Sequence, residues 1–310
     1  MKLAILGNFT VPYTSEHHHA QALTDLGHEV VMLQEGQTTA SGLVSQARDA
    51  EALVWVHTHG WETPGGIVPA LQDLRRHRVT VLAYHLDLWR GLGRERDLTG
   101  GHPYLSQVDH FFTVDPGMAE WLSANTRATG HYLPAAVAHR ECWMAPAAER
   151  DIRVAFVGSH RYHPEWPYRT KLIARLLDRY KGDFHLIPGQ GQPVRGAALN
   201  RLYGRTQVVV GDTLCPGFNY PGYWSDRVYE TLGRGGFMVH PRIDGLDRQF
   251  SDGDHLAYYD YNDFDGLFAT IDRYLDDPEE RESIRAFGHA EVHLNHTYLQ
   301  RWETILETIK

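Results

Sequence analysis

The sequence is poor in cysteine, and its two cysteines are far apart. Cys142 and Cys215 fall in different predicted domains and form no CxxC pair. A disulfide framework needs more cysteines, and a structural zinc site needs closely spaced ligands. Neither is therefore indicated, and we expect the two thiols to have structural or incidental roles.

Long apolar runs are also missing. No stretch approaches the roughly 18 consecutive apolar residues that cross a bilayer. Met1-Lys2 leads directly into a short apolar run rather than into a signal peptide. We therefore expect no membrane span and a cytoplasmic protein.

Positive charge is in deficit as well. The formal net charge is -9 at pH 7, and acidic residues outnumber basic ones in both halves of the chain. This excludes a protein whose main role is to coat nucleic acid, because such binding relies on a basic face. Six arginines form a local exception, at positions 75, 76, 78, 90, 94 and 96. A solvated face is the expected explanation, and contact with phosphates is the alternative.

The apolar segments that are present predict two α/β domains. Short apolar runs alternate with helical patterns, which indicates parallel sheets. In the first half we expect strands at 2–7, 29–33, 52–56, 79–84 and 110–114, with helices at 17–26 and 68–76. In the second half we expect strands at 152–157, 184–187, 207–210 and 237–240, with helices at 168–180, 226–233, 264–275 and from 278 onward.

The 310 residues accordingly divide into two Rossmann-like domains whose ligand loops face a central cleft. The expected bounds are residues 1–140 for the first domain, 141–151 for a linker and 152–290 for the second domain. A helix at 291–310 is expected to pack back on the first domain. The GxGxxG fingerprint is absent after the first strand, so an NAD-dependent oxidoreductase is not expected.

The segment from Ser225 to Gly236 carries the clearest chemistry. Ser225 or Asp226 can cap a helix whose free amides attract phosphate oxygens. Arg227 adds a permanent charge for a diphosphate, and Glu230, one turn later, can accept hydroxyl hydrogen bonds from a ribose. The alternative is a capped helix on which Arg227 and Glu230 form a surface ion pair.

This segment belongs to an ordered set of motifs that resembles a known family. After it come Gly245-Leu246 and Phe250, Asp252-Gly253, Tyr258-Tyr259, Asp277-Pro278-Glu279-Glu280-Arg281, and Asn295-His296-Thr297-Tyr298 with Arg301. The set is similar to the carboxy-terminal half of the glycosyl transferases group 1 family, and most similar to its spore-maturation-type and phage subgroup. Phe156-Val157-Gly158-Ser159 and Arg169 extend the match more loosely.

The resemblance implies the GT-B fold and transfer of a sugar from a nucleotide-diphosphate donor, with a UDP-sugar expected. Residues 1–140 would then form the acceptor-side domain and residues 152–290 the nucleotide-sugar-binding domain. It also implies a hexosyltransferase-like enzyme with no essential metal and no cofactor, since the nucleotide-sugar is a substrate. Glu230 matches the acidic residue that binds the donor ribose, and Arg227 matches a position near the diphosphate. Many relatives have a second acidic residue eight positions earlier, where this chain has Gly222.

Two further loops are candidates for donor binding. Gly158, Ser159 and Arg161 follow a strand, and a glycine there lets the backbone approach a phosphate. Gly189, in the loop after the next strand, is expected beside the nucleotide base. An ordinary strand-to-helix turn explains either glycine equally well.

Catalytic residues are expected in the first domain. The stretch from Ala83 to Arg90 comes at the end of a strand and resembles the histidine-aspartate loop of many relatives. Within it, Asp87 is the first choice for general base, with His85 second. An ordinary helix cap is the alternative. The loops holding Asn8 and Thr10, and His57 and Trp61, are expected to face the acceptor.

The run His17-His18-His19 is not expected to bind metal, because neighbours on a helix point about 100° apart. The leading hypothesis is therefore transfer of a sugar from a nucleotide-sugar donor to the hydroxyl of a small molecule or glycan. One alternative is a phage-type enzyme acting on a modified base in DNA. Another is a nucleotide-sugar-binding module without turnover. The oligomeric state is left open.

Overall fold

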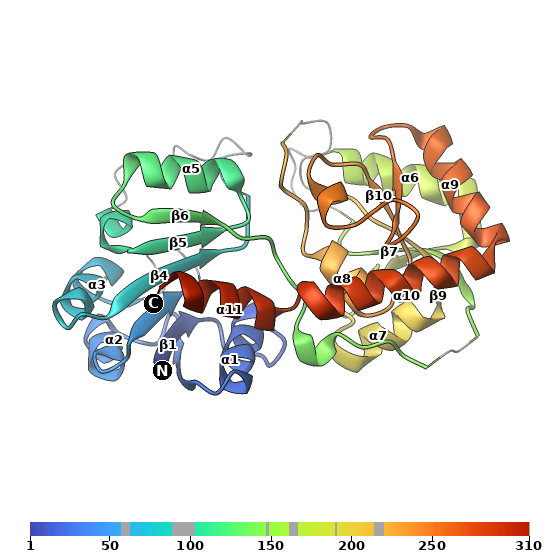
Figure 1. Ribbon diagram of the computed structural model, residues 1–310. Coiled ribbons are helices and arrows are strands. Elements are labelled where there is room, and N and C mark those ends of the chain that lie inside the picture. Colours follow the sequence, from blue (N-terminus) through green and yellow to red (C-terminus); the bar gives the residue numbers. More distant parts are fainter. Residues whose placement is uncertain are drawn as a thin grey trace. The chain divides into compact units, whose positions relative to one another are not determined.

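The computed structural model describes residues 1–56, 63–88, 103–146, 149–160, 167–189, 191–213 and 220–309. The chain forms two compact units. Met1–Pro134 and Tyr298–Lys310 make up the first unit, and Ala135–Thr297 makes up the second. Each unit is a parallel sheet with helices on its faces (Figure 1). Both are Rossmann-like, as the alternation of apolar runs and helical patterns predicted.

The first unit has a six-stranded sheet in the order β2-β1-β3-β4-β5-β6. Its elements are β1 (Lys2–Gly7), α1 (Ser15–Asp25), β2 (Glu29–Gln34), α2 (Ala40–Ala47), β3 (Ala52–Trp55), α3 (Ile67–Arg76), β4 (Thr80–His85), η2 (Pro103–Gln107), β5 (His110–Thr113), α5 (Pro116–Asn125), β6 (Thr129–Tyr132) and α11 (Tyr298–Thr308).

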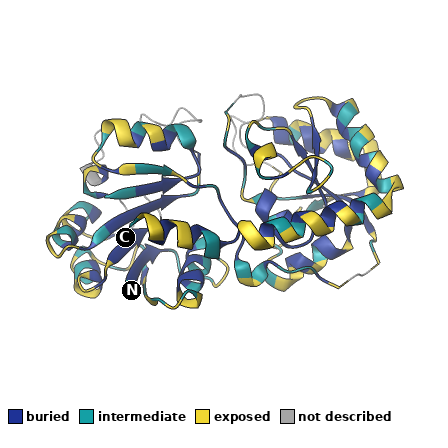
Figure 2. Ribbon diagram, in the orientation of Figure 1, coloured by how far each residue is buried: buried dark blue, intermediate teal, exposed yellow. Residues whose placement is uncertain are grey.

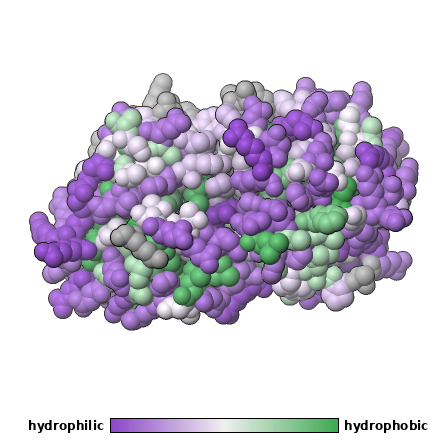
Figure 3. Space-filling view, in the orientation of Figure 1, coloured by the Kyte–Doolittle hydropathy of each residue, from purple (hydrophilic) through white to green (hydrophobic). Residues whose placement is uncertain are grey.

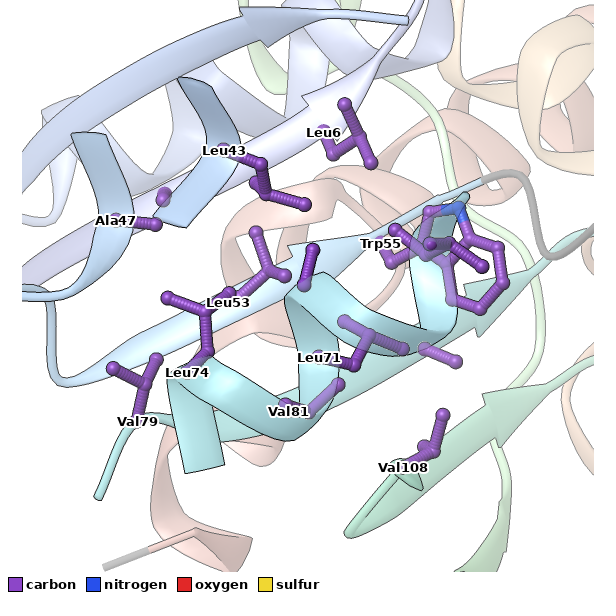
Figure 4. Packing of buried hydrophobic residues seen from close by; sticks show 14 of the residues in the cluster. Leu6, Leu43, Ala47, Leu53, Trp55, Leu71, Leu74, Val79, Val81 and Val108 are labelled. Carbon is purple, nitrogen blue, oxygen red and sulfur yellow. The ribbon is translucent and has the colours of Figure 1, made fainter. Parts of the chain in front are cut away.

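Alternate residues of the central strands of this sheet form one core with α2, α3 and α5. Leu6, Leu53 and Trp55 point to this side and meet Leu43 of α2 and Leu71 of α3 (Figure 4). This burial of apolar area drives the packing of the helices.

The opposite face of the first sheet carries α1 and α11, which lie side by side (Figure 1). Trp302 of α11 donates a hydrogen bond from Nε1 to Nδ1 of His19 on α1, at 3.1 Å. The last helix of the chain is therefore part of the first unit.

The second unit has a five-stranded sheet in the order β11-β10-β9-β7-β8. Its elements are η3 (His139–Glu141), β7 (Ile152–Val157), α6 (Tyr168–Tyr180), η4 (Lys181–Asp183), β8 (Phe184–Ile187), α7 (Gly196–Arg205), β9 (Thr206–Val210), α8 (Arg227–Gly233), β10 (Met238–Pro241), η5 (Leu246–Arg248), β11 (Ala257–Tyr259), α9 (Phe264–Asp276) and α10 (Pro278–Asn295).

The core of the second unit lies between the sheet, α6 and α9. Phe156 of β7 and Val208 of β9 pack there against Leu172 of α6 and Leu267 of α9. On the other face, Tyr203 of α7 packs against Val209. The central strands β1, β3 and β4 of the first unit and β9 and β10 of the second are almost entirely buried (Figure 2), as in parallel sheets covered on both faces. The edge strands β2, β6 and β8 are more exposed.

Strand order fixes where ligand loops gather in each unit. In the second sheet the chain runs from β7 outward to β8 and then returns to β9 on the other side of β7. The carboxyl ends of β7 and β9 therefore form a topological switch point, where open α/β sheets bind their ligands. In the first sheet the corresponding point lies between β1 and β3.

Candidate functional site

The switch point of the second unit brings together side chains from three elements. Gly158 directly follows β7, Asp212 lies two residues after β9, and Arg227 opens α8. Phe156, the penultimate residue of β7, makes cation–π contacts with both arginines of the cluster. The Cζ atoms of Arg169 and Arg227 lie 5.5 and 5.9 Å from its ring centroid. Two cations and one anion are thus gathered at the strand ends.

The guanidinium of Arg227 lies directly against the backbone of Gly158. A Cβ atom added at Gly158 would be 3.0 Å from both Cζ and Nη1 of Arg227. Gly158 also has a φ of 154°, at the edge of the region that favours glycine. The glycine is thus explained by the close approach of Arg227, which a plain strand-to-helix turn does not require.

Asp212 is the buried anion of this cluster. Its side chain is 1% exposed and pairs with that of Arg169, which is 7% exposed. Arg169 donates from Nε to Oδ2 at 2.6 Å and from Nη2 to Oδ1 at 3.1 Å. Oδ1 of Asp212 also lies 3.8 Å from Nη1 of Arg227. A buried carboxylate needs such partners, because an unpaired buried charge is strongly unfavourable.

The guanidinium of Arg227 is not fully hydrogen-bonded. Its Nη1 is buried and has no hydrogen-bond partner within the part of the chain that the structure describes. The side chain as a whole is 23% exposed. A cation that is held in place, partly exposed and incompletely hydrogen-bonded is suited to binding an anion.

The start of α8 differs in detail from the expected cap. Asp226 is the N-cap, but its side chain caps no amide. Ser225 does this instead: its Oγ accepts a hydrogen bond from the amide of Arg227 at 3.3 Å and donates one to Oδ1 of Asp226 at 3.0 Å. Both residues lie at the helix start, as the sequence predicted.

Glu230 is held by a residue of its own helix end. Its Oε2 accepts a hydrogen bond of 2.7 Å from Nε of Arg234, which is 2% exposed. Arg234 also pairs with Glu141 and donates to Oδ1 of Asn200 at 2.6 Å. Among the described residues no other group hydrogen-bonds the Glu230 carboxylate, so the alternative surface pair with Arg227 does not form.

Burial raises the pKa of Glu230, and the neighbouring charge of Arg234 opposes that rise. The second oxygen, Oε1, makes no hydrogen bond within the described residues. Glu230 therefore presents one oriented carboxylate oxygen one turn beyond Arg227, on the same side of α8.

Gly222 stands where many relatives have a second acidic residue. Its φ is +81°, and its amide donates to the carbonyl of Asp244 at 2.9 Å. A residue with a side chain is strained in this left-handed conformation. The local backbone therefore disfavours a carboxylate here.

Three predicted donor-site residues remain, Ser159, Gly189 and Arg161. Ser159 is exposed, and its carbonyl and Oγ lie 3.4 and 3.5 Å from Nη1 of Arg169. Gly189 follows β8 with a φ of +62°, so it occupies a turn that favours glycine. Arg161 lies outside the described residues.

In the first unit, His85 ends β4 and is buried, whereas Asp87 is exposed. Nδ1 of His85 lies 3.0 Å from the carbonyl of Asp87. A carbonyl only accepts, so Nδ1 carries the proton of this bond. The imidazole thus fixes the backbone that carries the Asp87 carboxylate.

The loop after β1 is stabilised by its own side chains. Oδ1 of Asn8 accepts hydrogen bonds from the amide of Thr10 at 3.0 Å and from its Oγ1 at 2.6 Å. Both residues lie at the switch point of the first sheet. His57 and Trp61, the other acceptor-side candidates, are outside the described residues.

The histidines of α1 have separate surroundings. Nδ1 of His17 lies 3.3 Å from Oγ1 of Thr14, whereas His19 is fully buried against Tyr84, Tyr298 and Trp302. Within the described ranges, no three His, Cys, Asp or Glu side chains are arranged to hold a metal ion.

Burial raises the pKa of the Cys142 thiol to about 12, which suits a structural role.

Three residues of the site region, Asp212, Arg234 and His240, were not predicted from the sequence. His240 of β10 is fully buried, and burial lowers its pKa to about 4. Asp212 left a signal, since a carboxylate one glycine after an apolar strand points to a strand-end ligand. Arg234 was indicated only by its spacing of four residues from Glu230, since its other partners, Glu141 and Asn200, are distant in sequence.

The model of the glycosyl transferase-like family matches residues 140–307, more than half of the chain. The chain belongs to this family. The match spans the whole Gly158, Asp212, Arg227 and Glu230 cluster. It does not distinguish the spore-maturation and phage subgroup from others. Among curated proteins, none is significantly similar in sequence.

Solved structures show the same fold over the full chain. The HepE protein (Alr3699) of Anabaena in complex with UDP and glucose has a TM-score of 0.67 at 10% identity, covering 100% of this chain and 99% of that chain. An alpha-glucosyltransferase in complex with UDP-glucose and DNA containing an abasic site has a TM-score of 0.68 at 12% identity and the same coverage. The sucrose-phosphate synthase of Thermosynechococcus elongatus has a TM-score of 0.65 at 11% identity, again with that coverage. The fold is therefore that of GT-B glycosyltransferases.

Family and fold together support a transferase of glycosyl groups. No helix in the described part of the chain combines the length and apolarity needed to cross a membrane. The surface seen in Figure 3 is mostly hydrophilic, with apolar residues in small groups.

Proposed function

We propose that the chain transfers a hexosyl group from a UDP-sugar to an acceptor hydroxyl. The observation that carries this proposal is the Arg227 guanidinium, which is packed on Gly158, lies 3.8 Å from Asp212 through Nη1 and is 23% exposed at the strand ends. In this role Arg227 neutralises the diphosphate as it leaves, and such fixed charges give a large share of catalysis. Complexes of the structural neighbours with UDP or UDP-glucose support UDP as the nucleotide.

Glu230 is proposed as the ligand of the donor ribose. A carboxylate accepts two hydroxyl hydrogen bonds, and Arg234 already orients it through Oε2. Oε1 then meets the ribose while Arg227 meets the phosphates. Ser159, Ser225 and the backbone of Gly158 complete the polar surroundings.

The reaction forms a bond between the acceptor oxygen and the anomeric carbon, and breaks the bond from that carbon to the β-phosphate oxygen. The acceptor proton passes to a base, for which we propose the exposed carboxylate of Asp87. His85 acts on it indirectly, by holding the Asp87 carbonyl. Asn8 and Thr10 are proposed to shape the acceptor side.

The DNA-directed alternative gains no support from the described arginines. Arg75 pairs with Asp109 at 3.6 Å, and Arg76 pairs with Asp73 at 3.3 Å. Arg75 and Arg76 are thus paired locally, as on an ordinary solvated face, whereas the exposed Arg78 forms no ion pair with a described residue. Arg90, Arg94 and Arg96 lie outside the described residues. A small-molecule or glycan hydroxyl therefore remains the proposed acceptor.

The test is turnover of UDP-, GDP- and dTDP-sugars by the wild type and by Glu230→Ala. We expect hydrolysis or transfer with UDP-sugars and a strong loss in the variant. Glu279→Ala, at an exposed position in the first turn of α10, is the matched control with unchanged turnover. Unaltered turnover in Glu230→Ala would remove the ribose assignment, and donor binding without any turnover would favour a binding module.

Metal independence is part of the proposal, since Arg227 supplies the charge that a divalent ion provides elsewhere. Activity should persist at full rate after treatment with EDTA. Loss of activity on chelation, restored by Mg²⁺ or Mn²⁺, would contradict it.

A further inference from the structure

Asp212 is a buried acidic residue in a site proposed to bind an anion. It follows β9 by two residues, and its side chain is 1% exposed. On charge alone a carboxylate here weakens phosphate binding, because like charges repel. Its presence at the switch point therefore needs a structural reason.

Arg169 fixes the orientation of this carboxylate. The two hydrogen bonds, of 2.6 and 3.1 Å, join the two oxygens of Asp212 to two nitrogens of one planar guanidinium. Such a bidentate pair sets the plane of the carboxylate as well as its distance. Arg169 is itself held in α6 and packed over Phe156.

The fixed carboxylate in turn faces Arg227. Oδ1 lies 3.8 Å from Nη1, which is close enough for attraction but longer than a hydrogen bond. Gly158 limits the guanidinium on another side. Arg169 neutralises Asp212, so the group of Arg169, Asp212 and Arg227 retains one excess positive charge. Arg227 is the partly exposed residue of the three.

We propose that Asp212 is a positioning residue of the donor site. It draws Nη1 of Arg227 inward and holds the guanidinium over Gly158, so that the outer N–H groups meet the donor diphosphate. This role rests on the proposed function. The competing explanation is that Asp212 only balances the buried charge of Arg169, in which case its own charge opposes binding of the diphosphate.

The two explanations predict opposite results for Asp212→Asn, which keeps the shape and removes the charge. Affinities for UDP and for uridine are measured by calorimetry, because only UDP carries the diphosphate. Positioning predicts about tenfold weaker UDP binding with uridine binding unchanged, since a charged hydrogen bond is misaligned. A pure charge effect predicts tighter UDP binding.

A double-variant cycle with Arg227→Met identifies the route of the effect. If Asp212 acts through Arg227, Asp212→Asn weakens UDP binding in the wild type but causes no further loss in Arg227→Met. Independent, multiplying losses would overturn the proposal, and so would an equal loss of uridine binding.

Arg169→Lys provides a second variant, which keeps the charge but loses the bidentate bond. It should also lower UDP affinity relative to uridine, and it decides the question if Asp212→Asn does not fold. Wild-type protein that binds neither compound overturns the proposed function together with this role. Wild-type protein that binds UDP, with variants that bind it equally well, overturns the positioning role alone.

Discussion

Arg234 holds Glu230 through a hydrogen bond of 2.7 Å between Nε and Oε2, from the first position after α8. The same guanidinium pairs with Glu141 and donates to Asn200. The buried guanidinium of Arg234 therefore bonds to the candidate ribose ligand Glu230, to Glu141 of η3 and to Asn200 of α7.

Replacing Arg234 by methionine should destabilise the protein strongly. The change leaves the carboxylates of Glu230 and Glu141 without their shared partner, and removing one side of a buried ion pair costs about 3–5 kcal/mol. Denaturant unfolding measures the loss. Arg242→Met is the control, because Arg242 is 47% exposed in its pair with Asp252 and such pairs contribute about 0–1 kcal/mol. Equal losses in the two variants would show that the Arg234 cluster is not structurally important.

Gly158→Ala should weaken donor binding without a change in charge. The new Cβ would meet the Arg227 guanidinium at 3.0 Å and displace it. We expect kcat/KM for the donor to fall about tenfold, which corresponds to about 1.4 kcal/mol of transition-state binding. Gly182→Ala is a matched control, because a Cβ there meets nothing within 4 Å. Equal kinetics for wild type and Gly158→Ala would contradict the packing of Arg227 on this glycine.

Asp87→Asn should lower kcat by about 10²–10⁴, the usual contribution of a general base, while the affinity for UDP stays unchanged. His85→Gln should have a smaller effect, because His85 holds the Asp87 backbone and does not take the proton. Steady-state kinetics with saturating donor separate the two. A larger loss in His85→Gln would transfer the role of base to the imidazole.

Acid should destabilise the first unit through His19. Burial, and then the nearby charge of His18, lowers the pKa of His19 to about 3. An unfolded histidine titrates near 6.5, so below that pH the unfolded state takes up a proton that the folded state excludes. Stability is therefore full above about pH 6.5 and is lost as the pH falls toward 3, by up to about 1.4 kcal/mol per pH unit.

The measurement is denaturant unfolding at several pH values between 7 and 4, for wild type and His19→Gln. The variant should show a shallower loss. The rings of Tyr84, Tyr298 and Trp302 surround His19. His240, whose pKa burial lowers to about 4, adds a loss of the same sign in the second unit. Identical slopes for both proteins would exclude His19 as a source.

The buried strands were predictable because parallel sheets produce continuous apolar runs. The ranges expected for β1, β8 and α6 coincide with the structure, at Lys2–Gly7, Phe184–Ile187 and Tyr168–Tyr180. By contrast, β6 (Thr129–Tyr132) has no buried residue and lies at a sheet edge, so its sequence carries no such run.

The end of the chain shows a different limit. A helix at 291–310 was expected to pack on the first domain, but α10 continues to Asn295 and only α11, from Tyr298, belongs to the first unit. The break at His296 and Thr297 comes from long-range pairing: the amide of Val137 donates to the carbonyl of His296 at 3.2 Å. Local sequence does not encode a partner so far away.

The candidate site was predictable to a similar degree. Arg227 and Glu230 could be chosen because both lie on one short motif with helical spacing. Asp212 reaches Arg227 through a contact between distant segments, and the wider bonding of Arg234 to Glu141 and Asn200 likewise became evident only from the fold.

The most direct test of the donor site compares UDP with 2′-deoxy-UDP. If Glu230 binds the ribose hydroxyls, wild-type protein should bind UDP at least about tenfold more tightly, since a lost hydrogen bond to a charged group costs about 1.5–3 kcal/mol. Glu230→Ala should bind both nucleotides with equal, weakened affinity. A variant that retained the full preference for UDP would contradict the account.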